Sequence, residues 1–219
     1  MGNKMFCFQC QETAGCKGCT QVGVCGKKPE VAAMQDLLIY VTKGLSAVTT
    51  RLRAEGKPVS REVNHLVTEN LFITITNANF DREAIIKAIE TTLTVKAECL
   101  AKLASRENLP EAALYNDGRD GFDEKAKKVG VLATENEDIR SLRELITYGL
   151  KGMAAYNHHV NAYGKSASGV DAFLQAALAK TLDDSLTAEE LTALALETGK
   201  YGVDVKIGRA SCRERVSSP

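Results

Sequence analysis

The sequence predicts an all-α protein, built as two successive small helix bundles behind a cysteine-rich amino-terminal loop. Three observations carry this prediction. Apolar residues recur at spacings of three and four along most of the chain, which is typical of helices with one buried face. Alternation of apolar and polar residues, which would indicate half-buried strands, does not persist over any convincing length. Finally, five of the seven cysteines fall within nineteen residues, from Cys7 to Cys25.

Composition excludes several classes of partner. The 219 residues contain 28 Lys+Arg and 28 Asp+Glu, so the formal net charge is zero. No basic field is available to bind nucleic acid or an anionic membrane. The first ten residues lack the apolar core of a secretory signal, and the longest apolar run, Leu37–Val41, is far shorter than a membrane span. We therefore expect a cytoplasmic protein with no nucleic-acid or membrane partner.

A reducing compartment disfavours structural disulfides, so the dense thiols predict a bound soft metal. Cys7 and Cys10 form a C-x-x-C pair. Cys16 and Cys19 form a second pair, and this set of four is typical of zinc. The alternative set adds Cys19 and Cys25 to the first pair, with gaps of two, eight and five residues. Such uneven spacing suits the four corners of an iron–sulfur cubane. Spacing alone leaves both sets open.

The first bundle is expected over residues 29–105. Pro29 suits the first position of a helix that runs to Glu55 and is closed by Gly56. A second helix begins near Ser60. Its end is rich in β-branched residues, but the three–four spacing before it favours helix over strand. Asp81 is the expected N-cap of a third helix, which reaches Ala104.

The second bundle is expected over residues 122–205, after a linker at 106–121. Its short first helix spans Phe122–Val129. Thr134 and Glu137 form a capping box for a long helix toward Tyr163, and the next helix spans Val170–Leu182. A second capping box, Thr187 and Glu190, opens the last helix, and Gly199 is the expected stop.

The end of the chain departs from this pattern. Lys206–Val216 has no helical period and carries four basic residues against one acid. It resembles the conceptual translation of a sequencing-library adapter. We therefore expect residues 206–219 to be a non-native tail, in which Cys212 has no role.

The remaining reactive side chains have ordinary structural interpretations. His158 and His159 are neighbours on a helix, so their side chains diverge by about 100° and do not face one metal. His65 is isolated in the sequence. Cys99 lies beside apolar helical positions and is expected to be a small packed hydrophobe. No set of residues predicts a nucleophile with its base.

Six segments together point to one family: MFCFQCQET, GCT, CGK, MQDLLIYVTKGLSA, TNANFD and GVLATENEDIRSLRELITYGLKGMAAY. They resemble segments of the hybrid-cluster proteins, also called prismane proteins or hydroxylamine reductases. The resemblance spans about Met5 to Val205. It implies that Cys7, Cys10, Cys19 and Cys25 bind a cluster, with Cys16 as an extra thiol that departs from the family pattern. The short loop between Cys10 and Cys19 resembles members that carry a [4Fe-4S] rather than a [2Fe-2S] cluster.

The resemblance also implies a function. This family reduces hydroxylamine to ammonia and water, with links to nitrogen-oxide stress, and receives electrons from a donor protein that these residues do not identify. The reaction occurs at a second centre, a hybrid iron–sulfur–oxygen cluster whose ligands come from later domains. We therefore expect an amino-terminal electron-transfer domain that ends before the catalytic domains and is inactive alone.

Two alternatives stand beside this expectation. One is a zinc-stabilised helical binding module that uses Cys7, Cys10, Cys16 and Cys19. The other is a fragment of a carbon monoxide dehydrogenase relative, since those enzymes resemble the family more distantly.

Two lysines indicate how the reduction potential of the cysteine centre is set. Lys27 and Lys28 precede the helix at Pro29, whose amino end carries partial positive charge. A thiolate cluster gains a negative charge on reduction, so positive charge nearby is expected to raise its potential.

Overall fold

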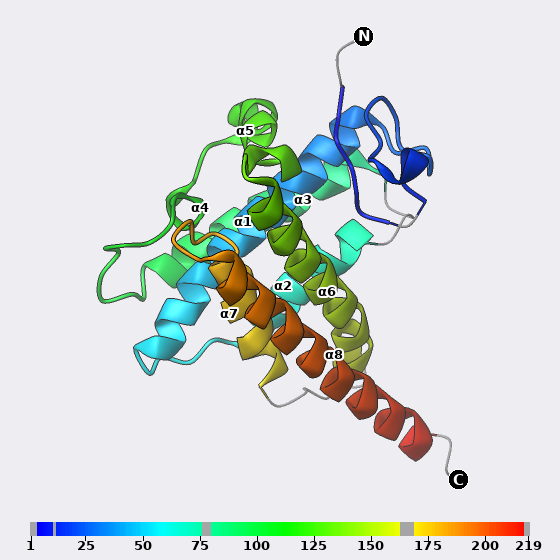
Figure 1. Ribbon diagram of the computed structural model, residues 1–219. Coiled ribbons are helices and arrows are strands. Elements are labelled where there is room, and N and C mark those ends of the chain that lie inside the picture. Colours follow the sequence, from blue (N-terminus) through cyan, green and yellow to red (C-terminus); the bar gives the residue numbers. More distant parts are fainter. Residues whose placement is uncertain (1–3, 11, 76–79, 163–168, 217–219) are drawn as a thin grey trace.

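The computed structural model describes residues 4–10, 12–75, 80–162 and 169–216, with side-chain environments up to residue 203 and at Val205. The described residues form eight α-helices and no extended strand, which confirms the all-α prediction (Figure 1). The helices are α1 (Pro29–Ala54), α2 (Arg61–Ile75), α3 (Arg82–Leu100), α4 (Glu111–Leu114), α5 (Phe122–Val129), α6 (Glu137–Ala162), α7 (Val170–Lys180) and α8 (Ala188–Val216). Short 3₁₀ turns occupy Ala14–Cys16, Arg119–Gly121 and Val131–Ala133.

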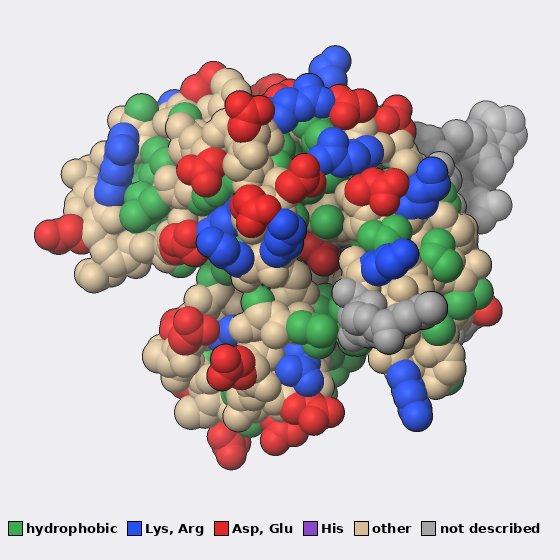
Figure 2. All heavy atoms as spheres, turned by 90° about the horizontal axis from the view of Figure 1, so that it is seen from above, with side chains coloured by type: hydrophobic (Ala, Val, Ile, Leu, Met, Phe, Trp, Pro, Cys, Tyr) green, Lys and Arg blue, Asp and Glu red, His purple; other side chains and the backbone are tan. Residues whose placement is uncertain are grey.

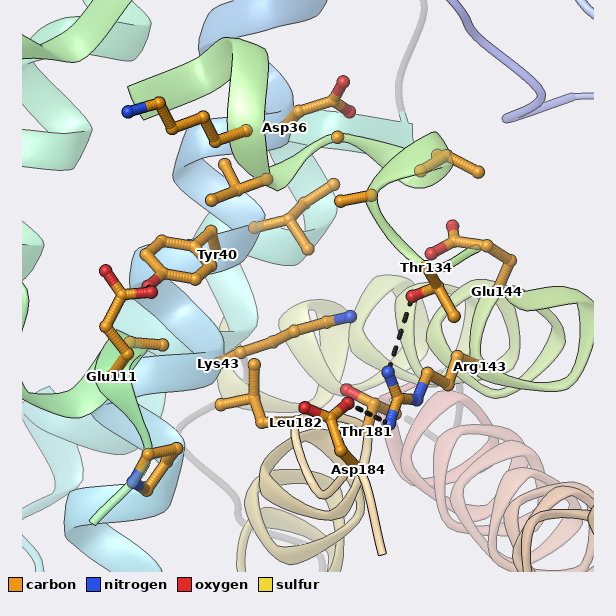
Figure 3. Close-up of a pocket in the computed structure, with 18 of the residues that line it drawn as sticks. Asp36, Tyr40, Lys43, Glu111, Thr134, Arg143, Glu144, Thr181, Leu182 and Asp184 are labelled. Atoms are coloured by element: carbon orange, nitrogen blue, oxygen red, sulfur yellow. Dashed lines mark hydrogen bonds and ion pairs between the residues drawn. The ribbon is translucent and has the colours of Figure 1, made fainter. Parts of the chain in front are cut away.

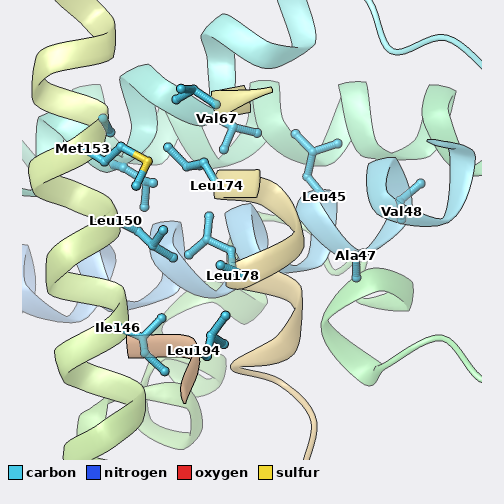
Figure 4. Packing of buried hydrophobic residues seen from close by; sticks show 14 of the residues in the cluster. Leu45, Ala47, Val48, Val67, Ile146, Leu150, Met153, Leu174, Leu178 and Leu194 are labelled. Atoms are coloured by element: carbon cyan, nitrogen blue, oxygen red, sulfur yellow. The ribbon is translucent and has the colours of Figure 1, made fainter. Parts of the chain in front are cut away.

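Helix α1 is the central element because its two halves belong to two different apolar cores. The first half packs on α3 and α5, where Leu37 and Leu38 meet Ile86 and Phe122. The second half packs with α2, α6, α7 and α8 around Leu45 (Figure 4). Figure 4 shows that core from close by, with Leu150 and Met153 of α6 directed toward Leu174 and Leu178 of α7. The division into units at 29–105 and 122–205 stays a prediction, because α1 contributes to both cores.

The apolar character of α1 follows from this central position. Among the described helices, α1 alone is long and apolar enough to cross a membrane by length and composition. In the most apolar 18-residue stretch of α1, 83% of the residues are buried within the protein. This apolar stretch is therefore covered by the other helices.

Several helix ends agree with the sequence. Pro29 occupies the first turn of α1, and α5 has the predicted bounds. The Asp81 carboxylate accepts hydrogen bonds from the backbone N–H groups of Glu83 and Ala84, which confirms it as the N-cap of α3. The capping box of α8 is also confirmed, since the Glu190 N–H donates to Thr187 Oγ1 and the Thr187 N–H donates to Glu190 Oε2.

Other helix ends differ from the prediction or lie outside the described residues. Helix α3 ends at Leu100 rather than Ala104. Helix α6 starts three residues after Thr134, because the Asn136 side chain accepts from the N–H groups of Asp138 and Ile139 and acts as the cap instead. The expected ends of the second and fourth long helices, at Thr76 and Tyr163, lie outside the described residues.

The prediction that the last helix stops at Gly199 is wrong. Helix α8 continues through Gly199 and Gly202 to Val216, and its last turns extend away from the other helices in Figure 1. A helical glycine costs only about 1 kcal/mol relative to alanine. Packing of α8 along α6, with Thr198 and Val205 buried, outweighs that cost. Whether residues 206–219 are native stays a prediction.

The expected linker at 106–121 contains structure of its own. Helix α4 lies in it, and Ala112 and Ala113 are buried against α1. The contact depends on Gly44, because a Cβ atom added there would overlap the backbone carbonyl of Ala112. A helix of four residues is too short to show a period in the sequence.

Candidate metal centre

A two-stranded contact organises the cysteine-rich loop. Cys7 and Cys19 form an isolated antiparallel bridge and exchange both backbone hydrogen bonds, at 3.0 and 2.9 Å. Residues opposed in this way carry their side chains on the same face, with Cβ atoms about 5.5 Å apart. Met5 and Cys19 pack with Ala32, which fixes the bridge to the first turn of α1. Two of the four predicted ligands are therefore brought together at the amino end of that helix.

The sulfur of Cys19 lies in surroundings that favour the thiolate. Its side chain is buried, which by itself raises the pKa of a thiol. The N–H groups of Ala14 and Val24 hydrogen-bond to the sulfur, and the Thr13 hydroxyl lies 3.7 Å from it. Together with the Lys27 ammonium these donors outweigh burial, so the pKa of Cys19 is lowered. A metal-binding sulfur needs the same donors.

Cys7 differs from its partner across the bridge. Its half-buried sulfur has a raised pKa, mainly because burial disfavours the thiolate, while Lys27 opposes that shift. The Lys27 ammonium lies 3.9 Å from Cys7 Sγ, although Lys27 is only 2% exposed. A buried cation next to a sulfur is the arrangement expected around an anionic thiolate centre.

A tight turn carries Cys25. The Gly23 N–H donates to the Lys27 carbonyl at 2.8 Å, and Gly26 has a φ of 87°, a conformation that favours glycine. A Cβ atom on Gly23 would lie 3.1 Å from Cys25 Sγ and 3.0 Å from Lys27 Cβ. Glycine at position 23 therefore leaves room for the close approach of the Cys25 sulfur. The Cys25 side chain is exposed.

Cys10 and Cys16 share a different environment. Both line a groove of about 750 Å³ between the loop and α6, together with Phe8, Leu132 and Tyr148. Cys16 is exposed and adopts a φ of 56°, which is uncommon for a residue with a side chain. This shared groove was not predicted from the sequence.

The structure thus brings the predicted ligands together only in part. Cys7, Cys10, Cys16, Cys19, Cys25 and Cys99 are all free thiols. In the described ranges, no three His, Cys, Asp or Glu side chains are arranged to hold one metal ion. The assignment of Cys7, Cys10, Cys19 and Cys25 as ligands therefore stays a prediction. The donor set of free thiols, N–H groups directed at sulfur and a buried ammonium fits a thiolate-bound metal centre.

A buried charged cluster lies behind the loop, and sequence reasoning missed it. Lys151 of α6 is fully buried, and its ammonium donates to the side-chain carbonyl of Gln9, inside the Cys7–Cys10 pair. Burial lowers the pKa of Lys151 to about 8 and raises that of Asp36, on α1, to about 7. The signal available was position: Lys151 falls on the buried stripe of α6, between Thr147 and Ala154.

This charged cluster continues into a pocket of about 510 Å³ between α1 and α6 (Figure 3). Lys43 extends from α1 into the pocket, toward Arg143 and Thr134, and Glu144 faces it from α6. Arg143 is held by the Asp184 carboxylate at 2.9 Å. On the outer face shown in Figure 2, basic and acidic side chains are interspersed rather than gathered by sign.

The three histidines and Cys99 lie away from the cysteine loop. The His158 ring stacks on Phe72 at 4.6 Å, and His65 accepts from Arg61. Cys99 is buried in the larger core, as predicted.

Known proteins are similar to this chain over both the cysteine-rich loop and the helices that follow it. A model of the "Prismane/CO dehydrogenase family" matches residues 5–215. The hydroxylamine reductase of Desulfovibrio desulfuricans is 58% identical over 204 residues, which cover 93% of this chain and 37% of that protein. The hydroxylamine reductase of Clostridium perfringens is 55% identical over 207 residues, covering 91% and 38%. That of Bacteroides thetaiotaomicron is 51% identical over 199 residues, covering 91% and 36%. The chain thus spans a little over a third of the length of these relatives.

Proposed function

The chain belongs to the prismane/CO dehydrogenase family, and on that premise we propose that it is the amino-terminal, iron–sulfur electron-transfer part of a hydroxylamine reductase. The similarity to proteins named hydroxylamine reductase supports this branch over a carbon monoxide dehydrogenase. The substrate of the whole protein would then be hydroxylamine, and the setting cytoplasmic, with a separate protein as electron donor.

The observation that carries the proposal is the Cys7–Cys19 bridge. It sets two thiols side by side. The N–H groups of Ala14 and Val24 donate to the Cys19 sulfur, and the Lys27 ammonium lies 3.9 Å from the Cys7 sulfur. Cys10 follows Cys7 at C-x-x-C spacing, and the turn at Gly23 presents Cys25 on the same loop. A [4Fe-4S] cluster bound by these four thiolates would accept and release single electrons, which no protein side chain in this loop can do.

The chain's own residues have separate roles in this proposal. The four cysteines would bind the iron. The N–H groups of Ala14 and Val24 stabilise the charged form of Cys19 by hydrogen bonding to its sulfur. Lys151 holds the Gln9 side chain and thereby fixes the segment between Cys7 and Cys10. Substrate chemistry at a hybrid iron–sulfur–oxygen centre belongs, in this proposal, to the part of the relatives that this chain does not cover.

The test is metal content combined with single substitutions. Anaerobically prepared protein is expected to be brown and to bind about four irons with matching sulfide. Cys7→Ser, Cys10→Ser, Cys19→Ser and Cys25→Ser should each impair loading, whereas Cys16→Ser and Cys99→Ser should not. Stoichiometric zinc without visible absorbance would contradict the proposal.

A zinc-binding module on Cys7, Cys10, Cys16 and Cys19 is the second candidate, because Cys10 and Cys16 line the same groove. The same variants separate the two. Loss of metal in Cys16→Ser with retention in Cys25→Ser would favour zinc and overturn our ligand assignment.

A further inference from the structure

Lys27 is buried in a way that calls for an anion. Its side chain is 2% exposed, and its ammonium has Cys7 Sγ as a hydrogen-bond partner at 3.9 Å. In the part of the chain that the structure describes, no carboxylate forms an ion pair with it. Burial of an ammonium without a counter-charge is costly, so such a group is normally paired. The hydrogen-bond partner that the fold offers here is a sulfur, that of Cys7.

The backbone fixes where this ammonium points. The Lys27 carbonyl accepts from the Gly23 N–H at 2.8 Å, and Gly26 closes the turn with a hydrogen bond to the Gly23 carbonyl at 2.8 Å. The Lys27 Cβ packs closely on Gly23, where an added Cβ atom would lie 3.0 Å from it. The turn therefore delivers the lysine inward, while Lys28, the next residue, is exposed.

The neighbouring charges leave a positive excess behind the cysteines. Lys27, Lys43 and Lys151 all interact electrostatically with the Asp36 carboxyl, and Lys43 and Lys151 also interact with that of Glu144. Burial raises the pKa of Asp36 to about 7, so this carboxyl carries only part of its charge near neutral pH. An anion at the cysteines would balance the remaining positive charge.

We propose that Lys27 sets the reduction potential of the cysteine centre by holding its buried ammonium against Cys7, and that Lys28 does not. The inference rests on the proposed iron–sulfur function and specifies which residue tunes it. Reduction adds one negative charge to a thiolate cluster, so a fixed positive charge at short range stabilises the reduced form and raises the potential. Water and salt screen the exposed Lys28 but not Lys27.

Redox titration of the wild type and two charge variants tests the proposal. The 219-residue chain is loaded with iron and sulfide and titrated anaerobically as wild type, Lys27→Gln and Lys28→Gln. Lys28→Gln is a matched control because it removes the same charge one residue away. We expect the midpoint potential of Lys27→Gln to shift to a more negative value and to stay shifted at high salt. Lys28→Gln should match the wild type.

Other outcomes overturn the proposal. Equal shifts in the two variants, a shift that high salt abolishes, or a higher midpoint in Lys27→Gln would each contradict it. Lys27→Arg keeps the charge and should restore a near-wild-type midpoint, which a purely structural role would not require.

A variant that fails to bind iron also gives a result. If Lys27→Gln and Lys27→Met bind no iron but Lys27→Arg does, the buried cation is required for loading. A midpoint of Lys27→Arg equal to that of the wild type then supports the proposal, and a clearly shifted midpoint contradicts it. If Lys27→Arg fails as well, packing rather than charge explains Lys27, and the proposal falls. Absence of iron in the wild type would instead defeat the proposed function itself.

Discussion

Asp36 shows how strongly burial governs single residues in this fold. It lies on α1 facing Lys151, Lys43 and Glu144, and burial raises its pKa to about 7, although the three lysines Lys151, Lys27 and Lys43 oppose the shift. The unfolded chain releases this proton near pH 4, whereas the folded protein retains it until about pH 7. The free energy of unfolding therefore falls as the pH rises through this window.

Asp36→Asn should remove that loss. We expect the variant to be more stable than the wild type by about 1–3 kcal/mol at pH 8 and to show no gain at pH 4. Urea unfolding of cluster-free protein at both pH values measures the difference. Asp120→Asn, at an exposed position, serves as control and should follow the wild type. A gain of equal size at both pH values would contradict the assigned pKa.

At the scale of single residues, the sequence indicated which side chains are reactive but not the surroundings in which they lie. The cysteine spacing identified the loop, and the uneven gaps kept Cys25 among the candidates. The sequence could not distinguish the buried Lys27 from the exposed Lys28, because a lysine in a loop is normally solvated. Only the turn at Gly23 directs Lys27 inward. Lys151 could have been flagged, since a lysine on a buried helical stripe is unusual.

The contact between α1 and α4 is an element-scale feature with a clear test. Gly44 lets the short helix lie against α1, and a methyl group there would overlap the Ala112 carbonyl. We expect Gly44→Ala to lower the free energy of unfolding by about 2 kcal/mol or more, because backbone must move to relieve the overlap.

Gly152→Ala on α6 provides the matched control. A Cβ atom at Gly152 would meet no other atom within 4 Å. Higher helix propensity should then stabilise the protein by up to about 1 kcal/mol. Thermal unfolding of both variants compares them, and equal effects would show that the α1–α4 approach tolerates a side chain.

Where a helix begins or ends depends here on competing caps and on contacts between helices, which local sequence does not show. Thr134 and Asn136 are both good caps, and Asn136 prevails while Thr134 accepts a hydrogen bond from Arg143. Gly199 signals a stop, yet the contact of α8 with α6 carries the helix past it. By contrast, Asp81 and the Thr187 box cap their helices as predicted, although Asn79 and Ser185 lie two residues before them.

At the scale of the whole molecule, the chain covers 37% of the Desulfovibrio desulfuricans relative. If the hybrid centre belongs to the uncovered part, the loaded 219-residue chain should produce no ammonia from hydroxylamine with a reduced dye as donor. The full-length relative, assayed in parallel, provides the positive control. Turnover well above that of free iron–sulfur cluster would contradict the proposed division of labour.

The hydrogen bond from Lys151 to Gln9 joins residues 142 positions apart. During translation at about 5–20 residues per second, about 7–30 s therefore pass between the synthesis of Gln9 and that of Lys151. Throughout that interval the Cys7–Cys10 segment lacks its anchor, and its thiols are open to solvent, oxidants and stray metals. Productive metal insertion should accordingly follow the synthesis of α6. Ribosome-bound chains that end near residue 135 should leave Cys10 readily alkylated, whereas chains that expose α6 fully should protect it.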